Sequence, residues 1–236
     1  MNSFTHSEEL LQMAKDAVKA SRKLMTFGTA KKNRCLEAMA QAILNKSDEI
    51  KEANALDIQE AKNNGLSSAM VDRLLLNDDR IDAMAKGLND LVGLNDPVGK
   101  IESDFFRPNG LQIQKIRVPI GVIGIIYESR PNVTVDSFGL CLKAGNAVIL
   151  RGGKEAINSN RKLAEILQES GLEAGLPKGA VQLIPWTDRQ AVQVLLKMDQ
   201  YINLIIPRGG ESLIRAVTEQ STIPVIKHYK GVCHAY

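Results

Sequence analysis

The stretch 116–154, IRVPIGVIGIIYESRPNVTVDSFGLCLKAGNAVILRGGK, decides the fold of the chain. Its two apolar runs, 120–127 and 147–150, are short, β-branched and continuous, which is typical of strands covered on both faces. The residues between them, through Lys143, favour a helix that closes on Gly145, a residue suited to the left-handed position after a helix. Strand, helix and strand at this spacing indicate a right-handed βαβ unit. Both strands end in polar turns, where open α/β sheets bind ligands, so we expect the functional site there.

Working outward, strand and helix patterns continue to alternate after this unit. Helices are expected at 156–169, 189–196 and 211–219, and strands at 181–184, 202–206 and 224–226, with a further strand from Val232. Before the unit, residues 7–95 show helical spacing, with Ser47 as a helix N-cap, 63–65 (Asn-Asn-Gly) as a stop and Asn77 as another start. The chain is therefore expected to be α/β, with a doubly wound, largely parallel sheet behind an N-terminal helical segment.

Residues 96–119 differ from both neighbours and predict a hairpin. Asn109-Gly110 separates two segments, 99–106 and 111–118, and this dipeptide is a strong turn signal between strands. An exposed hairpin is an aggregation hazard unless it is paired or covered. It is either an edge ribbon or an oligomerisation arm, and we favour the arm.

Composition excludes several classes of function. The 236 residues are 44% hydrophobic and 24% charged, as in an ordinary soluble globular protein, and the net charge of +3, without basic blocks interleaved with aromatic residues, gives no indication of nucleic-acid binding. No apolar run approaches the roughly 20 residues that span a bilayer, and no signal peptide is evident. Cys35, Cys141 and Cys233 form neither a disulfide framework nor a metal pattern, so no metal site is expected and a cytoplasmic location is the default.

Basic residues gather at predicted strand ends: Arg151, Lys154, Arg208, Lys227, His228 and Lys230. This distribution suits an anionic small molecule, although scattered, solvated surface charge would look similar for any one of them.

Two glycine-rich turns carry the strongest chemical signal. Pro207, Arg208, Gly209 and Gly210 lie between a strand and a helix start, where free N–H groups favour an anion; this is not the G-x-G-x-x-G fingerprint, and alone it is more often a simple turn. The second turn holds Arg151, Gly152, Gly153 and Lys154, whose two cations could hold the 2′-phosphate of NADP. Asn132, which follows the first buried strand, could donate to a developing oxyanion or act as a helix N-cap.

Four stretches make the sequence similar to a known family: PIGVIGIIYESRPNVTVDSFGLCLKAGNAVILRGGKEA, GLPKGAVQLI, IIPRGGESLI and PVIKHYKGVCHAY. They resemble the γ-glutamyl phosphate reductases (glutamate-5-semialdehyde dehydrogenases) of the aldehyde dehydrogenase superfamily, over essentially the whole chain. The resemblance implies an aldehyde-dehydrogenase-like fold. It also implies NADPH-dependent reduction of L-glutamyl 5-phosphate to L-glutamate 5-semialdehyde and phosphate in proline biosynthesis.

The resemblance also implies roles for single residues. Asn132 matches the oxyanion asparagine, Arg151 the contact to the adenosine ribose, and Gly209-Gly210 the turn that faces the pyrophosphate. Lys227 and His228, together with Lys230, could meet the substrate's phosphate or carboxylate, with solvated loop charge as the alternative.

The family's nucleophilic cysteine lies in a later Pro-Gly-Val-Cys-Asn segment that this sequence does not contain. Cys141 is interpreted as packing, and Cys233 does not match the motif.

The chain is thus expected to be an N-terminal portion: 1–95 the helical part of the cofactor domain, 96–119 the arm, 120–227 the NADP-binding α/β domain and 228–236 the start of a catalytic domain. The partners implied are the small-molecule substrate, other copies of the full-length chain and glutamate 5-kinase. The alternative function is an inactive fragment that binds NADP(H) or a phosphate-bearing ligand.

Overall fold

Four parallel strands form the central sheet of the chain, whose residues 3–229 are described by a computed structural model. In space the strands follow the order β5 (Val181–Leu183), β4 (Ala147–Arg151), β3 (Val122–Tyr127) and β6 (Leu204–Arg208). Strands β4 and β5 are therefore added in turn on one side of β3, and β6, which comes last in the chain, pairs with the other side of β3. This reversal of direction next to β3 is the topological switch point of a doubly wound sheet.

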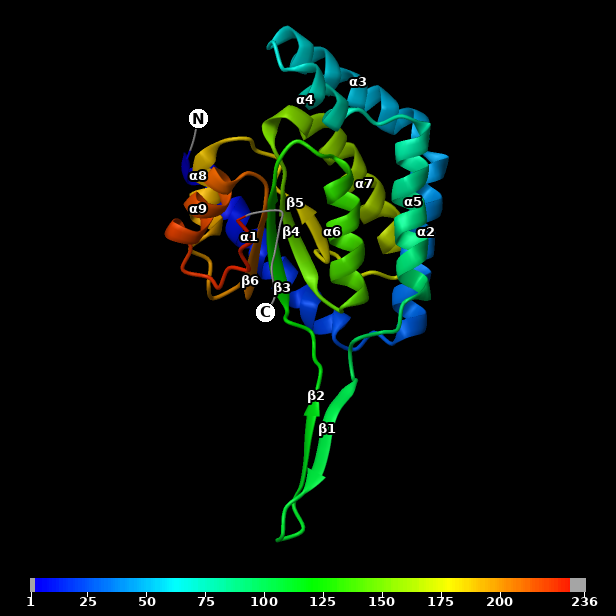
Figure 1. Ribbon diagram of the computed structural model, residues 1–236, viewed down its shortest axis with the longest axis vertical. Helices are drawn as coiled ribbons and strands as arrows, with labels where there is room; N and C mark the ends of the chain where they lie inside the picture. Colours follow the sequence, from blue (N-terminus) through cyan, green and yellow to red (C-terminus); the bar gives the residue numbers. More distant parts are fainter. Residues whose placement is uncertain (1–2, 230–236) are drawn as a thin grey trace.

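Helices cover both faces of the sheet (Figure 1). One face carries α6 (Asn132–Lys143) and α7 (Ile157–Glu173), with α2 (Thr29–Asn45) and α5 (Asp78–Gly93) packed behind them. The other face carries α1 (Ser3–Leu24), α8 (Arg189–Leu195) and α9 (Glu211–Gln220). The predicted α/β fold is confirmed. Within residues 3–229, no helix has the length and apolar character needed to cross a bilayer.

The βαβ unit is built as the sequence predicts. All six residues of β3 are buried, as are the first four of β4, because helices lie on both sides. Gly145 adopts φ +75° after α6, and the next residue, Asn146, donates its N–H to the Cys141 carbonyl at 2.8 Å. That left-handed turn closes the helix and sends the chain into β4.

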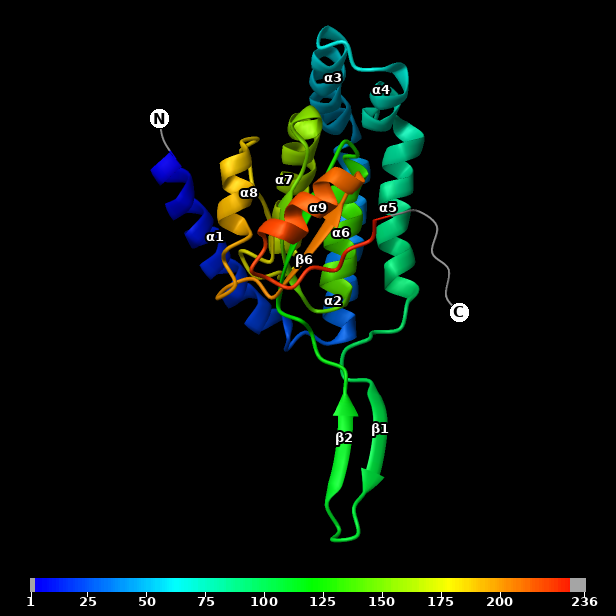
Figure 2. The same cartoon turned by 60° about the vertical axis from the view of Figure 1, so that its left-hand side comes forward.

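The predicted hairpin projects away from the body at the end opposite to the carboxyl ends of the strands (Figure 2). It consists of β1 (Ile101–Phe106) and β2 (Gln112–Ile116), paired antiparallel, with Gly110 at φ +84° in the turn. Nearly all of both strands is exposed to solvent, including the large apolar side chains of Ile101, Phe105, Phe106 and Ile116, and Leu111 is exposed in the turn between them.

Several expected boundaries are wrong. Ser47 is not an N-cap, because Lys46 holds that position and α3 (Ser47–Asn63) begins with the serine itself. The helix expected at 156–169 begins with a 3-10 turn, Lys154–Ala156, and its α-helical part runs on through Gly171. The expected strand at 224–226 is reduced to a single bridge between Val225 and Ile205.

A short helix, α4 (Ser68–Leu74), was not singled out within the helical segment expected at 7–95, and it lies with α3 beyond the carboxyl ends of the strands (Figure 1). The strand expected from Val232 lies outside the described residues.

Candidate functional site

The site expected at the switch point is formed by the turns that follow β3 and β6. Tyr127 pairs with Arg208 at the ends of these two strands, so the residues after them are neighbours. Gly210 donates its N–H to Glu128 Oε2 at 2.9 Å, which ties the two turns together. A cavity of about 440 Å³ lies between them. It is lined by Pro207, Arg208, Gly209, Gly210, Glu128 and His228, among others.

Neither glycine of this turn has a positive φ, and of the two only Gly209 lies in close contact with neighbouring side chains. A Cβ on Gly209 would lie 2.6 Å from Glu128 Cδ and 2.8 Å from Leu213 Cδ2, so a side chain there would require these two flexible side chains to move. Gly210 is the N-cap of α9 and offers no side-chain cap to the first turn of the helix. The Glu128 carboxylate therefore accepts from the helix N-terminus, at the place where the sequence predicts an anionic ligand.

The second basic turn follows β4, one strand further along the same edge. Ile126 of β3 pairs with Arg151, so β3 separates Arg151 from Arg208 and the two turns lie roughly 10 Å apart. The Arg151 guanidinium donates to the Thr187 carbonyl at 3.0 Å, while its buried Nε has no partner among the described residues. Burial lowers the pKa of Arg151, yet the group stays charged at neutral pH. Lys154 is exposed beside it.

Ser129 and Glu155 connect the turns after β3 and β4. Ser129 has φ +24° and donates both its N–H and its hydroxyl to Glu155 Oε1, each at 2.9 Å. Burial alone would raise the pKa of the Glu155 carboxyl, but backbone N–H groups, the Ser129 hydroxyl and the Arg151 charge hold it below its ordinary value. Sequence reasoning missed Glu128, Ser129 and Glu155, although the first two stand in the turn directly after a predicted strand.

Asn132 does not cap its helix, so the N-cap interpretation is wrong. Pro131 occupies the N-cap of α6, and Asn132 is the first helical residue. Its Nδ2 donates to Asp136 Oδ2 at 2.8 Å, and partial desolvation raises the pKa of Asp136, which this hydrogen bond partly offsets. Asn132 lines a second cavity, of about 450 Å³, together with residues of α4 and α5.

The remaining candidates differ in position. His228 borders the cavity at the switch point, whereas Lys227 is exposed and its ammonium lies 5.8 Å from the centre of the Tyr229 ring. Cys35 and Cys141 are buried, and burial raises the pKa of both thiols, that of Cys141 to about 12. Neither is a thiolate at neutral pH. Cys233 and Lys230 lie outside the described residues.

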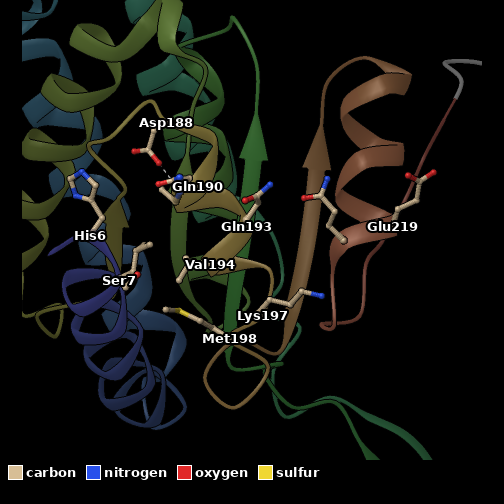
Figure 3. Close-up of a pocket in the computed structure, with 12 residues that line it drawn as sticks. His6, Ser7, Asp188, Gln190, Gln193, Val194, Lys197, Met198 and Glu219 are labelled. Atoms are coloured by element: carbon tan, nitrogen blue, oxygen red, sulfur yellow. Dashed lines mark hydrogen bonds between the residues drawn. The ribbon is translucent and has the colours of Figure 1, made fainter. Parts of the chain in front are cut away.

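A more voluminous pocket, of about 1040 Å³, lies away from this site, between α1, α8 and the end of α9 (Figure 3). His6 and Ser7 line it from α1, Gln190 and Gln193 from α8, and Glu219 from α9. It contains no arginine and none of the glycines of the two turns, so volume alone does not make it the candidate phosphate site. Among residues 3–229, no group of three or more potential metal ligands comes together.

Comparison with known proteins gives consistent results. The family model described as the aldehyde dehydrogenase family matches residues 3–231. The γ-glutamyl phosphate reductase of Halothermothrix orenii is 53% identical over 229 residues, which are 97% of this chain and 55% of that protein.

Two solved structures are similar as well. The crystal structure of γ-glutamyl phosphate reductase from Thermotoga maritima matches with a TM-score of 0.90 and 43% identity, over 92% of this chain and 52% of the other. The Saccharomyces cerevisiae enzyme of the same name matches with a TM-score of 0.85 and 36% identity, over 93% and 56%. The chain thus spans about half the length of the relatives that it matches.

Proposed function

Because the chain belongs to the aldehyde dehydrogenase family, we propose that it is the cofactor-binding half of a reductase that acts on L-glutamyl 5-phosphate. The product would be L-glutamate 5-semialdehyde, the step that proline biosynthesis requires, in the cytoplasm. The observation that carries the proposal is that relatives above 50% identity bear the name γ-glutamyl phosphate reductase, while both glycine-rich turns meet one edge of the sheet.

The residues at this edge fit a dinucleotide with a phosphorylated ribose. The buried Nε of Arg151 has no partner among residues 3–229, and Lys154 adds a second cation, as a 2′-phosphate of NADP would require. Gly152 and Gly153 complete that turn. Gly209 and Gly210 would admit the pyrophosphate to the N-terminus of α9, provided that the Glu128 carboxylate leaves the Gly210 N–H. Bound NADPH would supply the hydride that reduces the acyl group.

Asn132 would act on the carbonyl oxygen of the substrate. In the proposed reaction a cysteine thiolate attacks the acyl carbon, a carbon–sulfur bond forms, and the bond to the phosphate oxygen breaks, so that phosphate leaves and a thioester remains. The Asn132 amide has two hydrogens; Asp136 accepts one, and the other can donate to the oxyanion. Cys35 and Cys141 are buried with raised pKa values, and Cys233 does not match the nucleophile motif of the family, so we place the nucleophile in the Pro-Gly-Val-Cys-Asn segment, which this sequence does not contain.

Further roles follow from the same proposal. His228, at the cavity, and Lys227, nearby in sequence, would bind an anionic group of the substrate. The hairpin 96–119 would serve as the oligomerisation arm of a homo-oligomer, beside a cofactor domain at 1–95 and 120–227 and a catalytic domain that begins at 228–236. Glutamate 5-kinase, which would produce the labile acyl phosphate, is proposed as a contact in the pathway.

Titration of the chain with NADPH, and with NADH for comparison, tests the cofactor. Trp186 is the single tryptophan, and the next residue, Thr187, accepts the hydrogen bond of Arg151, so its fluorescence should report binding there. We expect saturable binding that is tighter for NADPH and that loses this preference in Arg151→Gln. Equal affinity for the two cofactors in the unaltered chain would contradict the assignment of NADP.

Turnover separates the two candidate functions. With semialdehyde, phosphate and NADP, the chain alone should be inactive, because Cys35 and Cys141 are buried and protonated and Cys233 does not match the nucleophile motif. Binding without turnover is also what an inactive NADP(H)-binding fragment would give. Activity of the full-length protein, lost on replacing its nucleophilic cysteine, decides for the reductase.

A further inference from the structure

Two arginines that sequence reasoning did not single out border both cavities near the site. Arg73, on α4, and Arg130, in the turn before α6, line the cavity at the switch point and also the cavity that contains Asn132. The two cavities, of about 440 and 450 Å³, are therefore adjacent, with the side chains of Arg73 and Arg130 bordering both. Together they form a trough from the Gly209-Gly210 turn to Asn132, and each part has the size of a small-molecule site.

The charges of Arg73 and Arg130 are not compensated by other described residues. Neither guanidinium group has a hydrogen bond or ion pair with any of residues 3–229, whereas Arg80, on the same trough, is paired with the Asp72 carboxylate at 3.0 Å. The acidic side chains that line the trough already have partners. Asp72 binds Arg80, Glu128 accepts from Gly210, and Asp136 accepts from Asn132.

Both arginines stand on well-anchored backbone. Asn54, a buried residue of α3, donates to the Leu74 carbonyl and accepts from the Leu76 N–H, each at 2.8 Å, so the end of α4 next to Arg73 is held in place. The turn that carries Arg130 is fixed one residue earlier, where Ser129 makes two hydrogen bonds to Glu155. The exposed side chains of Arg73 and Arg130 can therefore adapt to a ligand while the backbone that carries them stays fixed.

We propose that Arg73 and Arg130 bind the phosphoryl group of the substrate, next to the acyl carbon that Asn132 would face. The inference rests on the proposed function. One guanidinium group is enough to bind a carboxylate, through two parallel hydrogen bonds. A phosphoryl group has about two negative charges and three terminal oxygens, so two guanidinium groups together can neutralise and bind it. When the bond from the acyl carbon to the phosphate oxygen breaks, the electron pair stays on that oxygen, and the two cations stabilise the leaving phosphate.

The reverse reaction distinguishes a phosphate site from a carboxylate site, because the two anions then arrive on separate molecules. In the full-length protein, with semialdehyde, inorganic phosphate and NADP as substrates, Arg73→Gln and Arg130→Gln should each raise the KM for phosphate roughly 10-fold or more. The KM for semialdehyde should change less than about 2-fold, and Arg→Lys should restore part of the phosphate affinity. A rise in the KM for semialdehyde with an unchanged KM for phosphate would overturn the proposal.

A binding experiment separates this inference from the proposed activity. Inorganic phosphate is titrated into the chain and followed by phosphorus NMR line width, with Arg22→Gln on α1, on the other face of the sheet, as the matched exposed control. Line broadening that either trough variant abolishes, and the control does not, supports the site even if the reductase assay fails. Equal broadening in all variants would refute it even if the reductase is active.

Discussion

At the scale of single residues, Glu128 is the side chain that competes most directly with the proposed cofactor. Its carboxylate accepts the Gly210 N–H at 2.9 Å, at the positive end of α9, where a pyrophosphate would bind. Glu128→Gln removes the negative charge while keeping the size of the side chain. We expect NADPH to bind about 2- to 5-fold more tightly, as the energy of a charge at a helix terminus implies. Calorimetric titration of both proteins measures this.

The control for Glu128 stands on the same helix. Glu211 lies in the first turn of α9, but its carboxylate is paired with Arg215 at 2.7 Å. Glu211→Gln should therefore change the affinity for NADPH less than Glu128→Gln does. Weaker binding in Glu128→Gln would mean that the carboxylate holds the cofactor, for example through a ribose hydroxyl, rather than excluding it.

At the scale of the elements, Asp57 fixes the start of α7 from another helix. α7 has no side-chain cap of its own, and Asp57, 1% exposed on α3, accepts four hydrogen bonds there, two each from Asn158 and Ser159, at 2.6–3.1 Å. Asp57→Asn replaces one acceptor oxygen with a donor that faces other donors. We expect the free energy of unfolding to fall by about 2–3 kcal/mol.

Urea denaturation measures the effect of Asp57→Asn, with Asp48→Asn as the control. Asp48 lies on the same helix, but its side chain is 91% exposed and pairs with the partly exposed Lys51. That substitution should change stability by less than about 0.5 kcal/mol. If the two variants lose the same amount, the capping of α7 by Asp57 does not stabilise the fold.

The same elements explain what the sequence could and could not predict. The βαβ unit, the hairpin and the N-cap at Asn77, whose Oδ1 accepts the Arg80 N–H at 3.0 Å, depend on local signals and were predicted. Asp57 could not be found, because its role exists only once α3 packs on α7. The expected strand at 224–226 was wrong because an apolar β-branched run does not specify how much of it will pair.

The residues of the candidate site likewise include some that the sequence could predict and some that it could not. Both glycine-rich turns could be located, since their residues are adjacent in the sequence and follow predicted strands. Arg73 could not, because it stands on a seven-residue helix that is far in the sequence from both turns that border the cavity at the switch point. Asn132 was found as a site candidate, but its partner Asp136 and the N-cap at Pro131 became visible only in the structure.

At the scale of the whole molecule, a buried ion pair joins the N-terminal helices to the α/β unit. Lys32, on α2 and 1% exposed, binds Asp96 at 3.0 Å and also donates to the Lys143 carbonyl at the end of α6. Asp96→Asn leaves the buried ammonium without its counter-charge, so we expect a loss of about 3 kcal/mol in the free energy of unfolding. Asp90→Asn, at an exposed pair with Lys86, should cost less than about 0.5 kcal/mol.

The pH dependence of this pair has a definite sign. Burial alone would raise the pKa of Asp96, but the Val98 N–H, Lys32 and Thr29 outweigh it and lower the pKa below its ordinary value. The stabilisation is therefore complete above the unfolded-state pKa of about 3.9 and is lost as the pH falls below it. The free energies of unfolding of the unaltered protein and of Asp96→Asn, measured with urea, should differ at pH 7 and converge in acid. A constant difference down to acid pH would rule out the ion pair as its cause.

The hairpin has a row of large apolar side chains that no other described part of the chain covers. Phe106 is 69% exposed at the end of β1, and large apolar side chains recur along both strands. Exposed strand edges with apolar side chains pair with other chains unless they are covered, which is the physical basis for proposing an oligomerisation arm. We expect the protein to self-associate and Phe106→Glu to shift it towards the monomer, as measured by sedimentation velocity over a range of concentrations.

The matched control is Leu56→Glu, at a residue of α3 that is 57% exposed and far from the hairpin in both views (Figures 1 and 2). It introduces the same charge at another exposed apolar position, so it should leave the association unchanged. If association is lost in both variants, added charge rather than the hairpin is responsible. If Phe106→Glu associates like the unaltered chain, the projecting arm is not the interface.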